Sequence, residues 1–185
     1  MRIALVGKGG SGKTTVAAAF SRHLAASGCR VVAVDADINQ HLGAALGYGG
    51  PPPRALGADL GWLKEHLRGT NPRLPSADEM IKTTPPGSGS RLVDLGADDA
   101  VLRRFAVATP DGVRLLVAGA FAADDVGVTC YHAKTGAVEL YLNHLVDRRD
   151  WAAYHRTTVA MHRSNATAWA GVDRIAQIDP DFVPV

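Results

Sequence analysis

The chain has 185 residues, of which 46% are hydrophobic and 21% charged, and its formal net charge is +2 at pH 7. This composition is ordinary for a globular protein and excludes a chain that is disordered throughout, while the small net charge does not indicate a nucleic-acid partner. The two cysteines, Cys29 and Cys130, allow at most one disulfide, which favours a reducing, cytoplasmic location. We also expect neither a secretory leader nor a membrane span, because no apolar run approaches about 18 residues.

The chain begins with a pattern typical of phosphate binding. A strand predicted at residues 3–6 precedes the loop GKGGSGKTT at residues 7–15, and a helix follows with Val16, Phe20 and Leu24 on one apolar face. The spacing G-x-x-x-x-G-K-T is that of a P-loop, whose backbone N–H groups converge on phosphate oxygens beside the positive end of the helix dipole. In such a loop Lys13 reaches the β- and γ-phosphates and Thr14 ligates Mg²⁺. The expected nucleotide-binding residues are Gly9, Gly10, Ser11, Gly12, Lys13, Thr14 and Thr15.

Two other interpretations of this loop stay open. One is a glycine-rich turn, although a turn needs neither the lysine nor the hydroxyl group. The other is a dinucleotide-binding site for an NAD-type cofactor, because Gly7, Gly9 and Gly12 fit G-x-G-x-x-G and Asp35 follows about 20 residues later.

Residues 8–14, KGGSGKT, resemble the deviant P-loop of the MinD/ParA class of ATPases, which carries an additional lysine near the start of the loop. In that family the early lysine crosses a nucleotide-sandwich dimer and touches the phosphates bound by the partner subunit. The resemblance implies a homodimer that binds MgATP and hydrolyses it, with Lys8 acting in trans much as an arginine finger does. The alternative for Lys8 is a solvated loop lysine.

A second strand is predicted at residues 30–34, and Asp35 and Asp37 follow it. Strand, helix and strand form a βαβ unit, which places these carboxylates and the P-loop at the same edge of a parallel sheet. The resemblance implies that Asp37 belongs to the first switch and positions Mg²⁺ or the attacking water, with Asp35 in support. Lys8, Lys13 and Asp37 are therefore the candidate catalytic residues. The alternative is that both aspartates cap a helix beginning near residue 40.

The middle of the chain is less informative. A helix is predicted at residues 56–68, with Leu60, Leu63 and Leu67 on its apolar face. Residues 69–91 are rich in Pro, Gly, Ser and Thr and form either a lid or partner-facing insertion, or a long surface loop. Within this segment Ser76 and Glu79 have the spacing of a capping box.

A third core strand is predicted at residues 112–119 and a helix at residues 133–146. Cys130 and His132 lie between them. In the branch of the resembled family that matures nickel enzymes, a Cys-x-Cys pair in this neighbourhood binds metal at the dimer interface. Cys130 and His132 could supply two ligands per subunit to Zn²⁺ or Ni²⁺, or they could be a packed cysteine and a histidine at a helix start.

The fold class expected is α/β, a P-loop NTPase-like parallel sheet flanked by helices. The resemblance covers about residues 1–146 and implies that an apolar strand ending in aspartate, the Walker B element, should come next. No such strand is recognisable, and Asp94 is a poor substitute. We therefore expect an apparently truncated domain at residues 1–146 and a divergent helical tail at residues 147–185. A non-hydrolysing nucleotide-binding module that docks an unknown client protein remains the alternative function.

Overall fold

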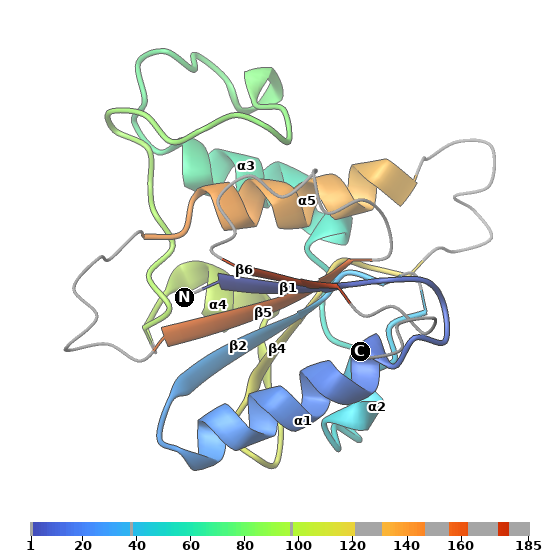
Figure 1. Cartoon of the computed structure of the whole chain (residues 1–185). Helices are drawn as coiled ribbons and strands as arrows, with labels where there is room; N and C mark the ends of the chain where they lie inside the picture. Colours follow the sequence, from blue (N-terminus) through green and yellow to red (C-terminus); the bar gives the residue numbers. More distant parts are fainter. Residues whose placement is uncertain are drawn as a thin grey trace.

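The computed structural model describes residues 2–37, 39–96, 98–120, 131–146, 156–162 and 174–177, and Figure 1 shows a sheet between two layers of helices. The strands are β1 (Arg2–Val6), β2 (Arg30–Asp35), β3 (Val107–Ala108), β4 (Arg114–Val117), β5 (Arg156–His162) and β6 (Arg174–Gln177). The α-helices are α1 (Lys13–Ala26), α2 (Leu42–Ala45), α3 (Leu60–Arg68), α4 (Ala100–Phe105) and α5 (Tyr131–Asn143), with short 3₁₀ helices η1 (Gly57–Asp59) and η2 (Ala77–Glu79).

The strand order is β3-β4-β2-β5-β1-β6, and all neighbouring pairs are parallel except β3 with β4. β5 lies between β1 and β2, where Val6 is opposite His162 and Asp35 is opposite Met161. The carboxyl ends of β1 and β2 therefore meet at the same edge of the sheet, as the βαβ pattern predicts.

The expectation of a helical tail after residue 147 is wrong for the residues that the structure describes there. Residues 156–162 and 174–177 are strands of the central sheet, and β5 forms backbone pairs on both sides. The sequence of β5, RTTVAMH, lacks the apolar run that the resemblance implies for a Walker B strand, but its β-branched residues Thr157, Thr158 and Val159 favour a strand. Hydrogen bonding from two parallel neighbours stabilises a segment whose own pattern is weak.

Each face of the sheet has its own core. Residues from α1 and α2 pack against Leu5, Val31 and Ala33, and residues from α3, α4 and α5 pack against Val32 and Val34. Figure 1 shows α1 and α2 on the opposite side of the sheet from α3 and α5. The alternation along β2 directs successive side chains to opposite cores.

The face of α1 that contacts the sheet differs from the expected one. Val16 is 45% exposed, whereas Ala17, Ala18 and Ser21 are buried. Phe20 and Leu24 are only partly buried at the edge of this core. The short side chains at 17, 18 and 21 allow the helix axis to approach the strands closely, which a pattern of large apolar residues does not reveal.

The segment at residues 69–91 packs against the layer that contains α5. Lys82 forms an ion pair with Glu139 at 3.5 Å, and its carbonyl oxygen accepts a hydrogen bond from Asn143 Nδ2 at 3.4 Å. Glu139 and Asn143 belong to α5, on the opposite face of the sheet from α1.

The capping box predicted at Ser76 and Glu79 is wrong, because Ser76 makes no side-chain hydrogen bond at the start of η2. In the described part of the chain, no helix is long and apolar enough to cross a membrane.

Candidate nucleotide site

The loop between β1 and α1 is closed by hydrogen bonds to one carbonyl oxygen. The Lys8 carbonyl accepts from Ser11 N at 3.3 Å, from Ser11 Oγ at 2.9 Å and from Lys13 Nζ at 2.8 Å. Gly10 and Gly12 have φ angles of 81° and 82°, a region that glycine adopts without strain. These two glycines turn the chain so that Gly12 leads directly into α1, where its carbonyl oxygen accepts from Val16 N at 2.9 Å.

A cavity of about 370 Å³ opens beside this loop. Its lining comes from the P-loop, the first turn of α1 and the segment after β2: Gly9, Gly10, Gly12, Lys13, Thr14, Thr15, Asp37, Asn39 and His41. The N-terminus of a helix, several glycine N–H groups and a lysine ammonium all favour an anion here. Thr14 and Asp37 add a hydroxyl and a carboxylate, oxygen donors of the kind that Mg²⁺ prefers.

The sequence placed Asp35 and Asp37 together, but the structure gives them different surroundings. Asp35 is 1% exposed, and its two carboxylate oxygens accept hydrogen bonds from Asp37 N at 3.2 Å and Leu42 N at 2.8 Å. Burial raises the pKa of Asp35, and these backbone hydrogen bonds oppose that rise. Asp37 instead lines the cavity, and its Oδ1 accepts from Asn39 N at 3.1 Å.

These hydrogen bonds bear on the alternative that both aspartates cap the helix beginning near residue 40. Leu42 is the first residue of α2, so Asp35 does satisfy a backbone N–H at that helix start, whereas Asp37 does not. With both oxygens occupied and buried, Asp35 is also poorly placed to receive ribose hydroxyl groups, which speaks against a dinucleotide-binding site.

Asn39 and His41 also line the cavity, although neither is among the site residues expected from the sequence. The dipeptide Asn39-Gln40 follows Asp37 where a switch loop would contact the γ-phosphate, and a short helix is expected to begin near His41. Their position within four residues of Asp37 was the available signal, because a loop at the carboxyl edge of a parallel sheet tends to contact the ligand.

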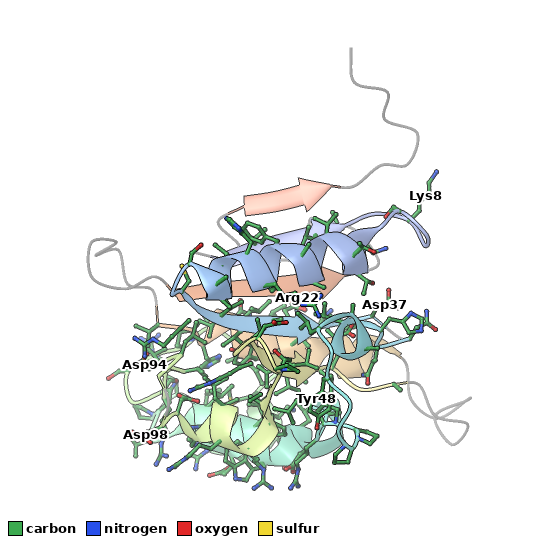
Figure 2. All side chains as sticks on the ribbon, turned by 90° about the horizontal axis from the view of Figure 1, so that it is seen from below. Lys8, Arg22, Asp37, Tyr48, Asp94 and Asp98 are labelled. Atoms are coloured by element: carbon green, nitrogen blue, oxygen red, sulfur yellow. The ribbon has the colours of Figure 1, made fainter. Side chains whose placement is uncertain are left out.

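Two of the candidate residues of the P-loop, Lys8 and Ser11, lie apart from the cavity. Lys8 is exposed and does not line it, and Figure 2 shows its side chain projecting away from the molecule. Ser11 is also absent from the lining and holds the loop through Lys8. Cys130 and the side chain of His132 lie outside the described residues. Within the described ranges, no group of three or more His, Cys, Asp or Glu residues could hold a metal ion.

Asp94 is not the missing Walker B aspartate in this fold. Figure 2 shows it at the opposite end of the molecule from Lys8 and Asp37. Its N–H donates to Asp99 Oδ2 at 3.0 Å, and the neighbouring Gly96 carbonyl accepts from Arg114, the first residue of β4, at 3.0 Å. These contacts place Asp94, Gly96 and Asp99 at the amino edge of the sheet, away from the P-loop.

Comparison with known families decides between the remaining interpretations. Residues 3–178 match the CobQ/CobB/MinD/ParA nucleotide binding domain. The chain belongs to this family. The resemblance drawn from residues 8–14 is therefore confirmed, and the family match extends beyond residue 146 through both late strands.

One relative in this family is the "Carbon monoxide dehydrogenase accessory protein CooC" of Rhodospirillum rubrum. It is 30% identical over 149 residues, which cover 80% of this chain and 51% of the relative. The chain thus spans about half the length of that protein, and the similarity identifies a distant homologue.

Proposed function

We propose that this nucleotide-binding domain binds MgATP and acts as an ATPase that dimerises around the nucleotide. The observation that carries the proposal is that one cavity is lined both by the P-loop glycines with Lys13 and Thr14 and by Asp37. An anion-binding loop facing a carboxylate is useful where a polyphosphate arrives together with a divalent cation, because the cation screens the carboxylate from the phosphates.

Each residue has a role that follows from its chemistry. The backbone N–H groups of Gly9 to Thr15 and the Lys13 ammonium would bind the phosphate oxygens, and the Thr14 hydroxyl and Asp37 would hold Mg²⁺. The bound Mg²⁺ would supply positive charge to the phosphate chain. Catalysis then depends on positioning and charge stabilisation, with no covalent intermediate.

The position of Lys8 is an argument for the proposed dimer. It stands in the P-loop but is exposed outside the cavity of its own subunit, a position suited to contact with nucleotide bound by a second copy. A cation supplied only on dimerisation would couple assembly to hydrolysis.

The cellular role that we propose is to drive a partner protein or a metal-cofactor maturation process. The homologous accessory protein from Rhodospirillum rubrum, named for its role beside carbon monoxide dehydrogenase, supports this direction. The aligned residues cover 51% of that relative, so its client protein is not carried over to this chain.

A second candidate function is a nucleotide-binding module that docks a partner without hydrolysis. β5, which adjoins β1, ends at His162 instead of the aspartate that the family carries at the end of its Walker B strand. A water-bridged contact from that strand to Mg²⁺ would then be missing, which favours binding without turnover.

Calorimetric titration of MgATP into the full chain tests the proposal, with Lys13→Ala as the loss-of-function variant. Lys82→Ala is the matched control, because Lys82 lies on the α5 side of the sheet with its side chain 52% exposed. We expect the wild type and Lys82→Ala to bind equally and Lys13→Ala to give no heat. Absence of binding by a folded wild type would overturn the proposal. Phosphate release that depends on Lys13 would separate the ATPase from the passive module.

A further inference from the structure

The segment at residues 37–42 is attached at both ends to one buried carboxylate. Asp35 Oδ1 accepts from the N–H of Asp37 at 3.2 Å, and Oδ2 accepts from the N–H of Leu42 at 2.8 Å. The carbonyl oxygen of Asp35 accepts from Ala118 N at 2.8 Å, which fixes Asp35 to the chain leaving β4. A single side chain thus sets the distance between the start of this segment and the first residue of α2.

Gln40, which lies between these two attachment points, has a strained backbone conformation. Gln40 has φ 49°, and no other non-glycine residue in the described part of the chain has a positive φ. Its N–H donates to the Asp37 carbonyl oxygen at 3.3 Å, while its buried Nε2 atom has no hydrogen-bond partner among the described residues. Such a conformation persists only where the surroundings enforce it, and strain of this kind is concentrated at functional sites.

The same segment supplies one wall of the phosphate cavity. Asp37, Asn39 and His41 all line it, whereas Asp35 does not. Since both oxygens of Asp35 are occupied by backbone N–H groups and the residue is buried, its effect on a ligand must pass through the segment that it holds.

We propose that Asp35 is a positioning residue for nucleotide binding: by holding Asp37 and Leu42, it keeps Gln40 in its strained conformation, places Asp37 where Mg²⁺ would bind, and places Asn39 and His41 beside the phosphates. This inference rests on the proposed MgATP site. It assigns to Asp35 no contact with the nucleotide or Mg²⁺.

The substitution that tests this role is Asp35→Asn, which keeps the shape of the side chain. One amide oxygen still accepts a hydrogen bond, but an NH₂ group then opposes an N–H, so one end of the segment is released. Asp99→Asn is the matched control. Asp99 Oδ1 also accepts from two backbone N–H groups, those of Val101 and Leu102, but at the amino edge of the sheet.

Titration calorimetry with MgATP and amide hydrogen exchange should be measured on both full-length variants. We expect Asp35→Asn to bind MgATP at least tenfold more weakly, with faster exchange confined to residues 37–42, while Asp99→Asn binds as the wild type does. A purely structural role for Asp35 would lower the melting temperature without changing affinity in the folded variant. Wild-type affinity in folded Asp35→Asn would therefore overturn the inference.

Hydrogen exchange of the unmodified protein keeps the inference testable if Asp35→Asn fails to fold. Without nucleotide, the amides of Asp37 and Leu42 should be protected, and unprotected exchange at both would overturn the positioning role. If the wild type binds no MgATP, the proposed function fails. Protection of the Asp37 and Leu42 amides then still tests, independently of nucleotide binding, whether Asp35 holds this segment.

Discussion

The ammonium group of Lys13 lies against the loop that carries it, and Lys13 Nζ donates a hydrogen bond to the carbonyl oxygen of Lys8 at 2.8 Å. Lys13 is only 6% exposed although it lines the phosphate cavity. A charged hydrogen bond of this kind keeps the side chain in place before a ligand arrives, so little conformational freedom remains to be lost on binding.

This relationship predicts the effect of Lys13→Met on stability. The substitution removes one hydrogen bond but also a buried charge, so the unfolding free energy without nucleotide should stay within about 1–2 kcal/mol of the wild type. MgATP at about 100 times its Kd should stabilise the wild type by about 2.7 kcal/mol and the variant not at all. Urea unfolding with and without MgATP measures both quantities, and equal ligand stabilisation in the two proteins would contradict the role of Lys13.

Lys8→Ala should separate binding from assembly. Because Lys8 does not line the cavity of its own subunit, the variant should bind MgATP with nearly wild-type affinity. The ATP-dependent dimer should weaken, and any phosphate release should fall by about 10³-fold, as for loss of a cation supplied in trans. Light scattering with a slowly hydrolysed ATP analogue measures the dimer, with Lys82→Ala as the control. A wild-type dimer with wild-type turnover in Lys8→Ala would support the alternative of a solvated loop lysine.

Two glycine substitutions should change stability in opposite directions. An added Cβ would meet nothing within 4 Å at either Gly12 or Gly61, so only backbone preference differs between the sites. Gly12 has φ 82°, and Gly12→Ala should destabilise the fold by about 1–2 kcal/mol. Gly61 lies in α3, where Gly61→Ala should stabilise by about 0.5–1 kcal/mol. Urea unfolding of both variants checks this, and a shift of the same sign in both would contradict the argument.

The sequence predicted those parts of the fold in which local pattern and chemistry agree. The P-loop, β1, β2, β4, α3 and α5 all follow from apolar periodicity and from glycine spacing, with small differences at their ends. The Gly12-Lys13-Thr14 motif could be recognised because phosphate binding requires those residue types at that spacing.

The parts that could not be predicted depend on distant partners. β5 becomes a strand through pairing with both β1 and β2, and α1 packs through Ala17, Ala18 and Ser21 because the sheet surface accepts a close helix. Periodicity likewise could not show that backbone N–H groups occupy Asp35 while Asp37 lines the cavity, because it does not reveal which backbone groups a side chain meets; only the family resemblance separated the roles of the two residues.

His144 should make stability depend on pH. The residue is 0% exposed, and its Nδ1 donates to the Leu140 carbonyl oxygen at 2.9 Å, which leaves Nε2 as an acceptor with no hydrogen-bond partner among the described residues. Burial lowers the pKa of His144, and the bond to Leu140 opposes this shift only in part. Protonation at Nε2 would add a buried N–H group without an acceptor, so the folded state binds a proton less readily than the unfolded state.

The sign follows from linkage. Above the unfolded pKa of about 6.5, His144 is neutral in both states and costs no stability; as the pH falls below that value, the unfolded state takes up the proton and the unfolding free energy decreases. One such group changes stability by at most about 1.4 kcal/mol per pH unit.

Urea unfolding at pH 7.5, 6.5 and 5.5 should therefore show a weaker loss of stability on acidification in His144→Gln than in the wild type. Burial raises the pKa of Asp99, which acts in the opposite direction, but this contribution is common to both proteins and cancels in the comparison. Equal pH slopes in the two proteins would mean that His144 titrates alike in the folded and unfolded states.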